Sequence, residues 1–288
     1  MASPSRSDDD SGAVLDPIPG HPAAIATLEG ERALVISDYH AGYEAGLRYE
    51  RGVDVPSQAS DRRDRLLGLL EQTAVDRLVV CGDLMHAIGD PGGAERGELE
   101  VLLESFPESV STTLVKGNHD GAIETWLGPD GDDQHESTGT DIDPNERVER
   151  ALEIVSGNGV RLGPLGVCHG HTWPAPEVLE ADVVCFGHEH PCIRLEDEVG
   201  GSRVEPIWLR GRLDPGPFAE RDEYDGLSWL NGGNPPRMVG LPAFNDLVGG
   251  TWVNVPGQSF LAPFLPDGIT DGEAYLLDGT RLGPFREV

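Results

Sequence analysis

Short apolar runs alternate with amphipathic segments in the first part of the chain. Residues 32–40 (RALVISDYH) and 76–83 (DRLVVCGD) each predict a buried strand that opens into a polar loop. Between these runs, the segment after Ser60 carries an apolar stripe behind an N-capping serine, which predicts an amphipathic helix. A third apolar run ends in TTLVKGNHD at residues 112–120. The order strand, helix, strand, helix, strand is typical of an α/β fold.

Later apolar runs are shorter and again end in polar residues, as in LGVCHGH at 165–171 and DVVCFGHEH at 182–190. We expect residues 128–147, which are acidic and dotted with glycine, to form a surface-loop insertion. Residues 212–250 are rich in Gly, Pro and aromatic residues, which fits either a substrate-facing excursion or a packed irregular loop. We expect residues 1–20 to be a disordered acidic tail and residues 21–288 to form a single domain.

The charge is extreme, with 21 basic and 51 acidic residues in 288 and a formal net charge of −30. Lys116 is the only lysine, and the acidic residues are spread along the whole chain. This composition resembles that of proteins adapted to high internal salt, with an ordinary acidic enzyme as the alternative. In molar salt the Debye length is about 3 Å, so the acidity does not exclude a nucleic-acid substrate.

The length of the apolar runs predicts where the protein is located. The first residues, MASPSRSDDDSG, contain no apolar stretch typical of a signal peptide, and no apolar run is long enough to span a bilayer. We therefore expect a cytoplasmic protein with no membrane partner. The four cysteines lie in or beside apolar runs without a CxxC pair, which favours buried reduced thiols over a thiolate metal site.

Polar side chains collect where the predicted strands end. Asp38 and His40 are two residues apart after a strand, so both side chains are expected to project to the same side, and His188 and His190 repeat this spacing. Only nine histidines are present, and five of them follow apolar runs next to Gly, Asp or Asn: His40, His119, His169, His188 and His190. Histidines with unrelated structural roles would not be distributed in this way.

In open α/β sheets, ligands gather outside the carboxyl ends of the strands, so these residues are expected to converge. The expected cluster is Asp38, His40, Asp83, Asn118, His169, His188 and His190. One zinc ion takes about four ligands, so two divalent ions that share a carboxylate fit this number of side chains better. Donors from Asp, Asn and His suit manganese first, with iron, zinc or nickel as alternatives.

The motifs D-x-H, G-D, G-N-H-D, H-G-H and G-H-x-H occur in this order between Asp38 and His190. In this order the chain resembles the calcineurin-like metallophosphoesterase superfamily. Residues 38–56, 82–86 (GDLMH) and 241–250 (LPAFNDLVGG) also resemble an archaeal phosphoesterase subfamily related to the SbcD repair nuclease. Together with the acidic composition, this second resemblance indicates a haloarchaeal protein. Tyr39 departs from the pattern, which has an aliphatic residue at this position.

The resemblance implies a four-layer α/β/β/α sandwich, in which two mixed sheets lie face to face with helices outside. It also implies that one metal ion is held by Asp38, His40 and His190, and the other by Asn118, His169 and His188. Asp83 is then expected to bridge the two ions.

Two divalent ions about 3.5–4 Å apart can hold a bridging water, lower its pKa and clamp the phosphate oxygens during in-line attack. The departing alkoxide still needs a proton, and we expect His119 to act as the general acid. For Asp120 two interpretations stay open: it orients His119 and raises its pKa, or it caps the helix that follows. His171 is expected to contact the substrate phosphate or to support a ligand by hydrogen bonding. His86 either lines the entrance of the site or caps a helix.

These features predict a dinuclear metal-dependent phosphodiesterase that acts on a phosphoester, such as a nucleotide or a nucleic acid. A DNA or RNA nuclease in repair is the alternative that the SbcD resemblance suggests, although the chain has no Lys/Arg stripe interleaved with aromatic residues. A non-catalytic scaffold of the same fold is a third alternative, disfavoured because no expected ligand and no expected acid is missing. A homodimer is compatible with the family resemblance.

Overall fold

The computed structural model describes residues 13–124, 152–197 and 199–288. The acidic insertion expected at 128–147 and the first 12 residues of the expected N-terminal tail lie outside these residues. The expectation of disorder over residues 1–20 is wrong for the end of that range. Leu15–Pro17 forms strand β1 and pairs with β2 (Ala24–Thr27). The Leu15 side chain is buried in the core at 5 % exposure, which holds this end of the chain in place.

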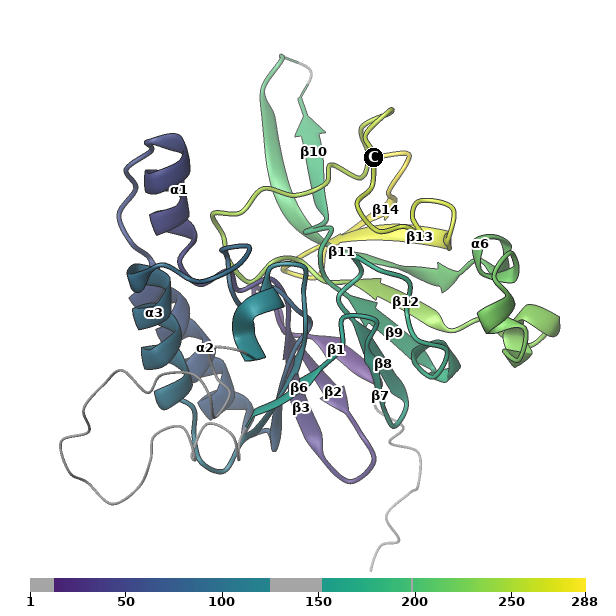
Figure 1. Cartoon of the computed structure of the whole chain (residues 1–288). Helices are drawn as coiled ribbons and strands as arrows, with labels where there is room; N and C mark the ends of the chain where they lie inside the picture. Colours follow the sequence, from purple (N-terminus) through teal and green to yellow (C-terminus); the bar gives the residue numbers. More distant parts are fainter. Residues whose placement is uncertain (1–12, 125–151, 198) are drawn as a thin grey trace, which may run out of the picture.

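The first sheet has the strand order β1-β2-β3-β4-β5-β6. Its parallel part consists of β3 (Arg32–Ile36), β4 (Arg77–Val80), β5 (Ser111–Val115) and β6 (Leu152–Val155), while β1 and β2 run antiparallel at its edge. The connections between the parallel strands contain α1 (Tyr43–Arg51), α2 (Ala59–Thr73) and α3 (Gly93–Glu104), which lie on one side of the molecule (Figure 1). These crossovers are the predicted alternation of strands and helices.

The second sheet has the order β14-β13-β11-β12-β9-β8-β7 and is also mixed. Strands β8 (Leu165–Cys168), β9 (Val183–Phe186) and β12 (Arg237–Gly240) are parallel neighbours. The remaining strands pair antiparallel: β7 (Val160–Leu162), β11 (Ser202–Leu213), β13 (Ile269–Leu276) and β14 (Arg281–Pro284). Strand β10 (Cys192–Glu196) pairs with β11 in a long hairpin that extends from the body (Figure 1).

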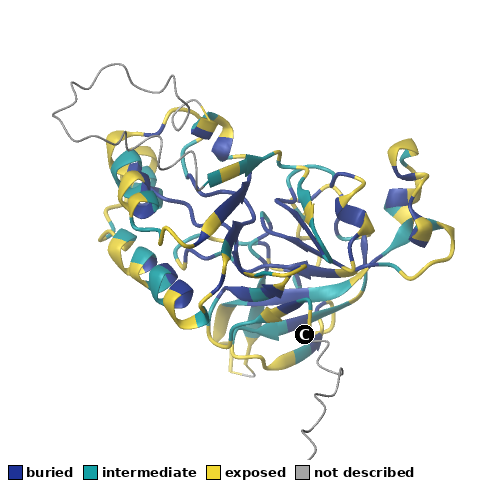
Figure 2. Cartoon of the chain, turned by 90° about the horizontal axis from the view of Figure 1, so that it is seen from below, coloured by how far each residue is buried: buried dark blue, intermediate teal, exposed yellow. Residues whose placement is uncertain are grey.

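The core lies on both faces of each sheet. Between the sheets, Val35 and Val79 from the first pack in one cluster with Cys185 and Trp208 from the second. The outer face of the first sheet packs against the apolar stripes of α2 and α3. The outer face of the second sheet is covered by α6 (Pro215–Ala219), short 3-10 helices and loops. Strands β8 and β9 are accordingly buried along their whole length, whereas exposed residues lie on the helices, the loops and parts of the outer strands (Figure 2).

The predicted fold class is therefore confirmed: two mixed sheets lie face to face, with only a few helices outside them. The segment 212–250 divides into two parts. Residues up to 240 pack onto the second sheet, with Phe218, Tyr224 and Trp229 buried, and include the central strand β12. Residues 241–250 reach the strand ends of the first sheet, where the Phe244 N–H donates to the Ser37 carbonyl. Among the described residues, every helix is too short or too polar to cross a membrane.

Candidate metal centre

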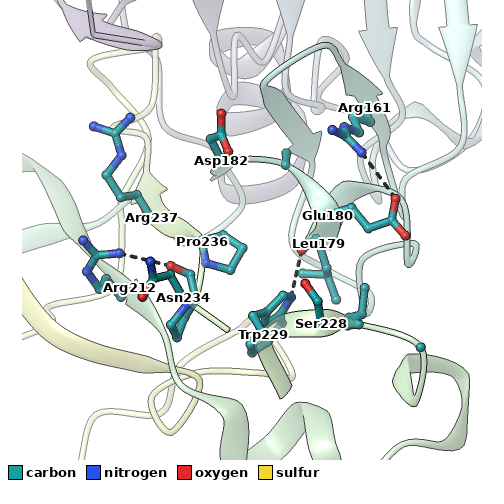
Figure 3. A pocket seen from close by; sticks show the side chains of 14 residues that line it. Arg161, Leu179, Glu180, Asp182, Arg212, Ser228, Trp229, Asn234, Pro236 and Arg237 are labelled. Atoms are coloured by element: carbon teal, nitrogen blue, oxygen red, sulfur yellow. Dashed lines mark hydrogen bonds and ion pairs between the residues drawn. The ribbon is translucent and has the colours of Figure 1, made fainter. Parts of the chain in front are cut away.

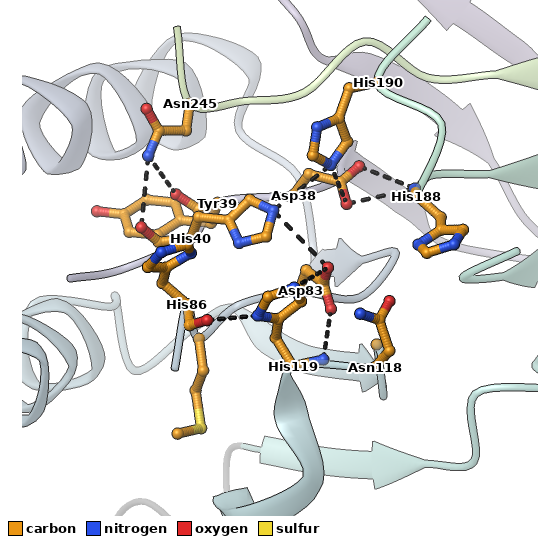
Figure 4. Close-up of polar contacts among 12 residues, drawn as sticks. Asp38, Tyr39, His40, Asp83, His86, Asn118, His119, His188, His190 and Asn245 are labelled. Atoms are coloured by element: carbon orange, nitrogen blue, oxygen red, sulfur yellow. Dashed lines mark hydrogen bonds and ion pairs between the residues drawn. The ribbon is translucent and has the colours of Figure 1, made fainter. Parts of the chain in front are cut away.

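The seven predicted ligand residues follow the carboxyl ends of five strands, three in the first sheet and two in the second. All of them except His169 are labelled in Figure 4. Their side chains form two groups whose donor atoms lie within 4.8 Å of one another. One group is Asp38, His40, Asp83 and His190, and the other is Asp83, His169 and His188. Asp83 belongs to both groups. Asn118 adjoins the second group, with its Oδ1 3.2 Å from His169 Nε2.

The donor atoms point at one another rather than at separate partners. His40 Nε2 lies 3.4 Å from His190 Nε2, and Asp83 Oδ2 lies 3.7 Å from His40 Nε2 and 3.4 Å from His169 Nε2. His40 Nδ1 is buried and makes no hydrogen bond to any residue that the structure describes. Converging carboxylate oxygens and imidazole nitrogens are the donors that divalent ions of the manganese to zinc series prefer, so the residues fit such ions.

Hydrogen bonds behind the site orient two of the imidazoles. His169 Nδ1 lies 2.7 Å from the Cys81 carbonyl oxygen, and His190 Nδ1 lies 2.7 Å from the Gly249 carbonyl oxygen. A carbonyl can only accept, so each Nδ1 carries the proton and each Nε2 faces the carboxylates. Both rings are thereby oriented with Nε2, the atom that would bind a metal ion, toward the carboxylates.

The backbone of the site is strained. Five of the seven candidate ligands have positive φ values: Asp38 (57°), His40 (49°), Asp83 (50°), His188 (66°) and His190 (43°). Among the other non-glycine residues that the structure describes, only two share this conformation. Non-glycine residues adopt it at a cost of about 1–3 kcal/mol, and such strain clusters at functional sites. Asp38 and His40 reach the same donor group, as expected, but left-handed turns beyond the strand, and not strand geometry, aim both side chains.

Close backbone packing supports the same geometry. A Cβ at Gly117 would overlap the carboxylate of Asp83, so glycine is required where the loop after β5 passes over that side chain. Asp83 also accepts a hydrogen bond from the His119 N–H at 3.0 Å. The G-N-H-D loop thus fixes the carboxylate that both groups share.

Burial and charge set the protonation of the site. Burial lowers the pKa of His40 to about 3 and that of His188 to about 4, so both imidazoles are neutral at pH 7 and offer lone pairs. Burial opposes a charge on His169 as well, but its contact with Asp83 raises the pKa of this imidazole to about 9. The His169 contact likewise outweighs burial at Asp83 and holds the pKa of that carboxyl below its usual value. Asp83 is therefore ionised.

His119 lies at the edge of the two groups, with its Nε2 3.9 Å from Asp83 Oδ2 and its side chain 20 % exposed. Its Nδ1 donates to the His86 carbonyl, not to a carboxylate. Both expectations for Asp120 are wrong, because its buried carboxylate accepts hydrogen bonds from the Gly117 N–H at 2.8 Å and the Met85 N–H at 2.9 Å. Asp120 thus ties the loop after β5 to the loop after β4.

Two further histidines lie beside the seven. The His86 ring stacks on His119, with ring centroids 5.6 Å apart, and lies 5.5 Å from the His40 ring, in keeping with a position at the entrance. The His171 ring lies 5.2 Å from that of His169 and 6.0 Å from that of His188. Burial lowers the pKa of His171 to about 4, so it too is neutral at pH 7.

Asn245 and Glu189 also support the site, and sequence reasoning assigned a role to neither. The Asn245 amide donates to the carbonyl oxygens of Tyr39 at 3.2 Å and His40 at 3.4 Å (Figure 4). The buried Glu189 carboxylate accepts from the N–H groups of residues 261 and 262. A signal for Asn245 was present, since it lies in the LPAFNDLVGG motif, but Glu189 had no signal beyond its place between two ligands.

Comparison with known proteins supplies the family. The model of the calcineurin-like phosphoesterase superfamily domain matches residues 32–210. Among solved structures, the Pseudomonas putida nuclease MPE is 19 % identical, with 93 % of this chain and 100 % of that chain covered and a TM-score of 0.48. Yfce, a phosphoesterase from E. coli, is 20 % identical, with 57 % and 73 % covered and a TM-score of 0.31. No curated protein matches the sequence.

The family match spans every one of the seven converging side chains, from Asp38 to His190. The chain belongs to the calcineurin-like phosphoesterase superfamily and is a phosphoester hydrolase.

Proposed function

We propose that the chain is a phosphodiesterase that works with two divalent metal ions. The observation that supports this most directly is that Asp83 belongs to both groups of donor atoms. In this proposal Asp83 bridges, one ion is held by Asp38, His40 and His190, and the other by Asn118, His169 and His188. Bound there, two divalent ions would activate a water for attack on phosphorus and neutralise charge on the phosphate oxygens.

His119 is the general acid of the proposed reaction. Its Nδ1 is occupied by the His86 carbonyl, which leaves Nε2 facing the site. As the bond between phosphorus and the leaving oxygen breaks, the proton on Nε2 passes to that oxygen. His171, a neutral imidazole beside His169 and His188, contacts the substrate phosphate from the second-sheet side.

Elemental analysis combined with a phosphodiesterase assay tests the proposal. Freshly purified protein is expected to carry about two metal ions per chain, manganese first among them. Chelation in high salt should abolish hydrolysis of bis-p-nitrophenyl phosphate, and readdition of manganese should restore it. The control variant His21→Ala should match the wild type in metal content and activity, since this histidine is outside both donor groups. Full activity in metal-stripped protein would contradict the proposal.

A nuclease related to SbcD, from a haloarchaeal source, is a second candidate. It is favoured by the place of the LPAFNDLVGG motif, whose Asn245 holds the backbone of His40. The formal charge of −30 fits a protein that works in molar salt. Parallel assays of bis-p-nitrophenyl phosphate, cyclic nucleotides and labelled single-stranded DNA in manganese and high salt distinguish the two candidates.

A further inference from the structure

A pocket of about 540 Å³, seen in Figure 3, is lined by residues at the opposite end of β9 and β12 from the candidate metal centre. Asp182, which precedes β9, and Arg237, which begins β12, both line it. The ligand candidates His188 and His190 follow the other end of β9. With a rise of about 3.3 Å per residue, the first and last of the four residues of β9 are roughly 10 Å apart. This pocket is therefore distinct from the metal centre.

Three arginines line the pocket: Arg161, Arg212 and Arg237. Arg212 on β11 and Arg237 on β12 are direct cross-strand partners. Like charges placed directly opposite each other on antiparallel strands are destabilising unless something between them carries the opposite charge. In a chain with only 21 basic residues and a net charge of −30, this juxtaposition needs an explanation.

Neighbouring groups leave the two opposed arginines with free donors. Arg212 uses one N–H group on the Pro235 carbonyl at 3.1 Å. The guanidinium of Arg237 makes no hydrogen bond or ion pair with any residue that the structure describes. Arg161, on the other side of the pocket, is already paired with Glu180 at 3.3 Å (Figure 3).

The acidic residues of the pocket do not neutralise this pair. Glu180 is held by Arg161, so Asp182 is the one remaining carboxylate against two guanidinium groups. Leu179 and Trp229 also line the pocket, and the indole N–H of Trp229 donates to the Leu179 carbonyl at 2.9 Å. A volume of about 540 Å³ falls within the range of small-molecule sites.

We infer that this pocket binds a small phosphate-bearing anion between Arg212 and Arg237. Guanidinium groups present pairs of N–H donors that match phosphate oxygens, and charge-assisted hydrogen bonds of this kind are about twice as strong as neutral ones. A bound phosphate also removes the repulsion between the two cross-strand charges. The inference does not depend on the chemistry of the metal centre.

Equilibrium dialysis with radiolabelled inorganic phosphate tests this site in the metal-loaded protein. The proteins compared are the wild type, the double variant Arg212→Gln/Arg237→Gln, and the control Arg203→Gln. Arg203 is on the same strand β11, is exposed and pairs with Glu205 at 3.3 Å outside the pocket. Phosphate bound at the metal centre is common to all three. Wild type and control should bind one phosphate more than the double variant, and equal stoichiometry in all three overturns the site.

A second variant guards against misfolding of the first. Arg237→Gln alone changes one exposed residue at the start of β12 and is expected to weaken phosphate binding at this site at least about tenfold. Phosphate should also raise the Tm of the wild type more than chloride does at equal ionic strength, and this difference should shrink in Arg237→Gln. Unchanged affinity and an unchanged phosphate effect on Tm in Arg237→Gln overturn the inference.

Discussion

The two sheets support their halves of the candidate metal centre in different ways. On the first-sheet side, carboxylates of helix α3 hold the loops that carry candidate ligands. Glu98 accepts from the Gly42 N–H at 2.8 Å, just after His40, and Glu95 accepts from the His86 N–H at 2.7 Å, just after Asp83. Glu98 is itself held by the buried Arg62 of α2 at 2.6 Å. Helices therefore brace this side.

On the second-sheet side, a distant loop takes the place of the helices. Glu189, between the candidate ligands His188 and His190, accepts from Thr251 Oγ1 at 2.5 Å and from the N–H groups of Leu261 and Ala262 at 2.6 Å. The Gly249 carbonyl orients the His190 ring. The brace on this side is thus a chain segment some 60–70 residues downstream of the ligands that it holds.

This difference shows that one site can combine two kinds of support. The first-sheet support comes from crossover helices that are close to the candidate ligand loops in sequence. The second-sheet support comes from residues 249–262, which are distant in sequence and pack back against the site. Substitutions on the two sides should therefore have separable effects. Asp83 is the exception, because it belongs to both donor groups.

The largest effect is expected from Asp83→Ala. Loss of the shared carboxylate should remove both metal ions and lower kcat/KM by at least about 10³-fold, since metal ions supply several kcal/mol of transition-state stabilisation. His188→Ala should keep one of the two ions. Elemental analysis after gel filtration measures both results. Two ions retained in Asp83→Ala would contradict the shared role.

His119→Ala, on the first-sheet side, should keep both metal ions and lower kcat by about 10²–10⁴-fold for a diester with an alkyl leaving group. The loss should be much smaller for bis-p-nitrophenyl phosphate, because p-nitrophenolate leaves without protonation. Comparing the two substrates isolates the proton transfer from general damage to the site. An equal loss for both substrates would rule out His119 as the general acid.

The first-sheet half of the site could be predicted from sequence for a physical reason. Apolar runs that end in Asp38, Asp83 and Asn118 alternate with helical segments, and parallel crossovers place such strand ends at one edge. The second sheet and its contact with the first depend on pairing between segments distant in sequence. That arrangement came from the family resemblance and not from periodicity.

The braces could not be predicted because they are made by tertiary contacts. Asp120 follows Asn118 and His119 closely enough to suggest a catalytic partner, yet its carboxylate faces two backbone N–H groups. Glu189 reads as an exposed residue between two ligands, yet it is fully buried. The left-handed residues His188 and His190 on either side of Glu189, and the 3-10 helix that begins at Asp120, set side-chain directions that the sequence pattern does not indicate.

Glu189→Ala should weaken the metal binding that depends on His188 and His190 by about 10–100-fold, the usual cost of removing a group that positions a metal ligand. Glu189→Gln keeps one acceptor oxygen and should lose less. Glu95→Ala is the matched variant on the first-sheet side, because this carboxylate holds the backbone of His86 and Ala87 in the loop after Asp83 and should leave His188 and His190 in place. Competition with a chelator measures the affinities, and an equal loss in Glu95→Ala would refute the contrast between the two sides.

The smallest effect concerns the pH dependence of the ion pair between Glu44 of α1 and Arg62 of α2. Burial disfavours its charge, but the Gln58 N–H and Arg62 outweigh burial and lower the pKa of this carboxyl below its usual value of about 4.5. Because the folded state binds the proton less tightly than the unfolded state, the stabilisation is complete above pH 4.5 and is lost as the pH falls through the folded pKa. Glu44→Gln should therefore reduce the free energy of unfolding by about 1 kcal/mol at pH 7, and this difference should vanish in acid. Urea melts between pH 7 and pH 3, with the exposed Glu50→Gln on the same helix as control, measure it, and a difference that does not change with pH would show that Glu44 stabilises by packing alone.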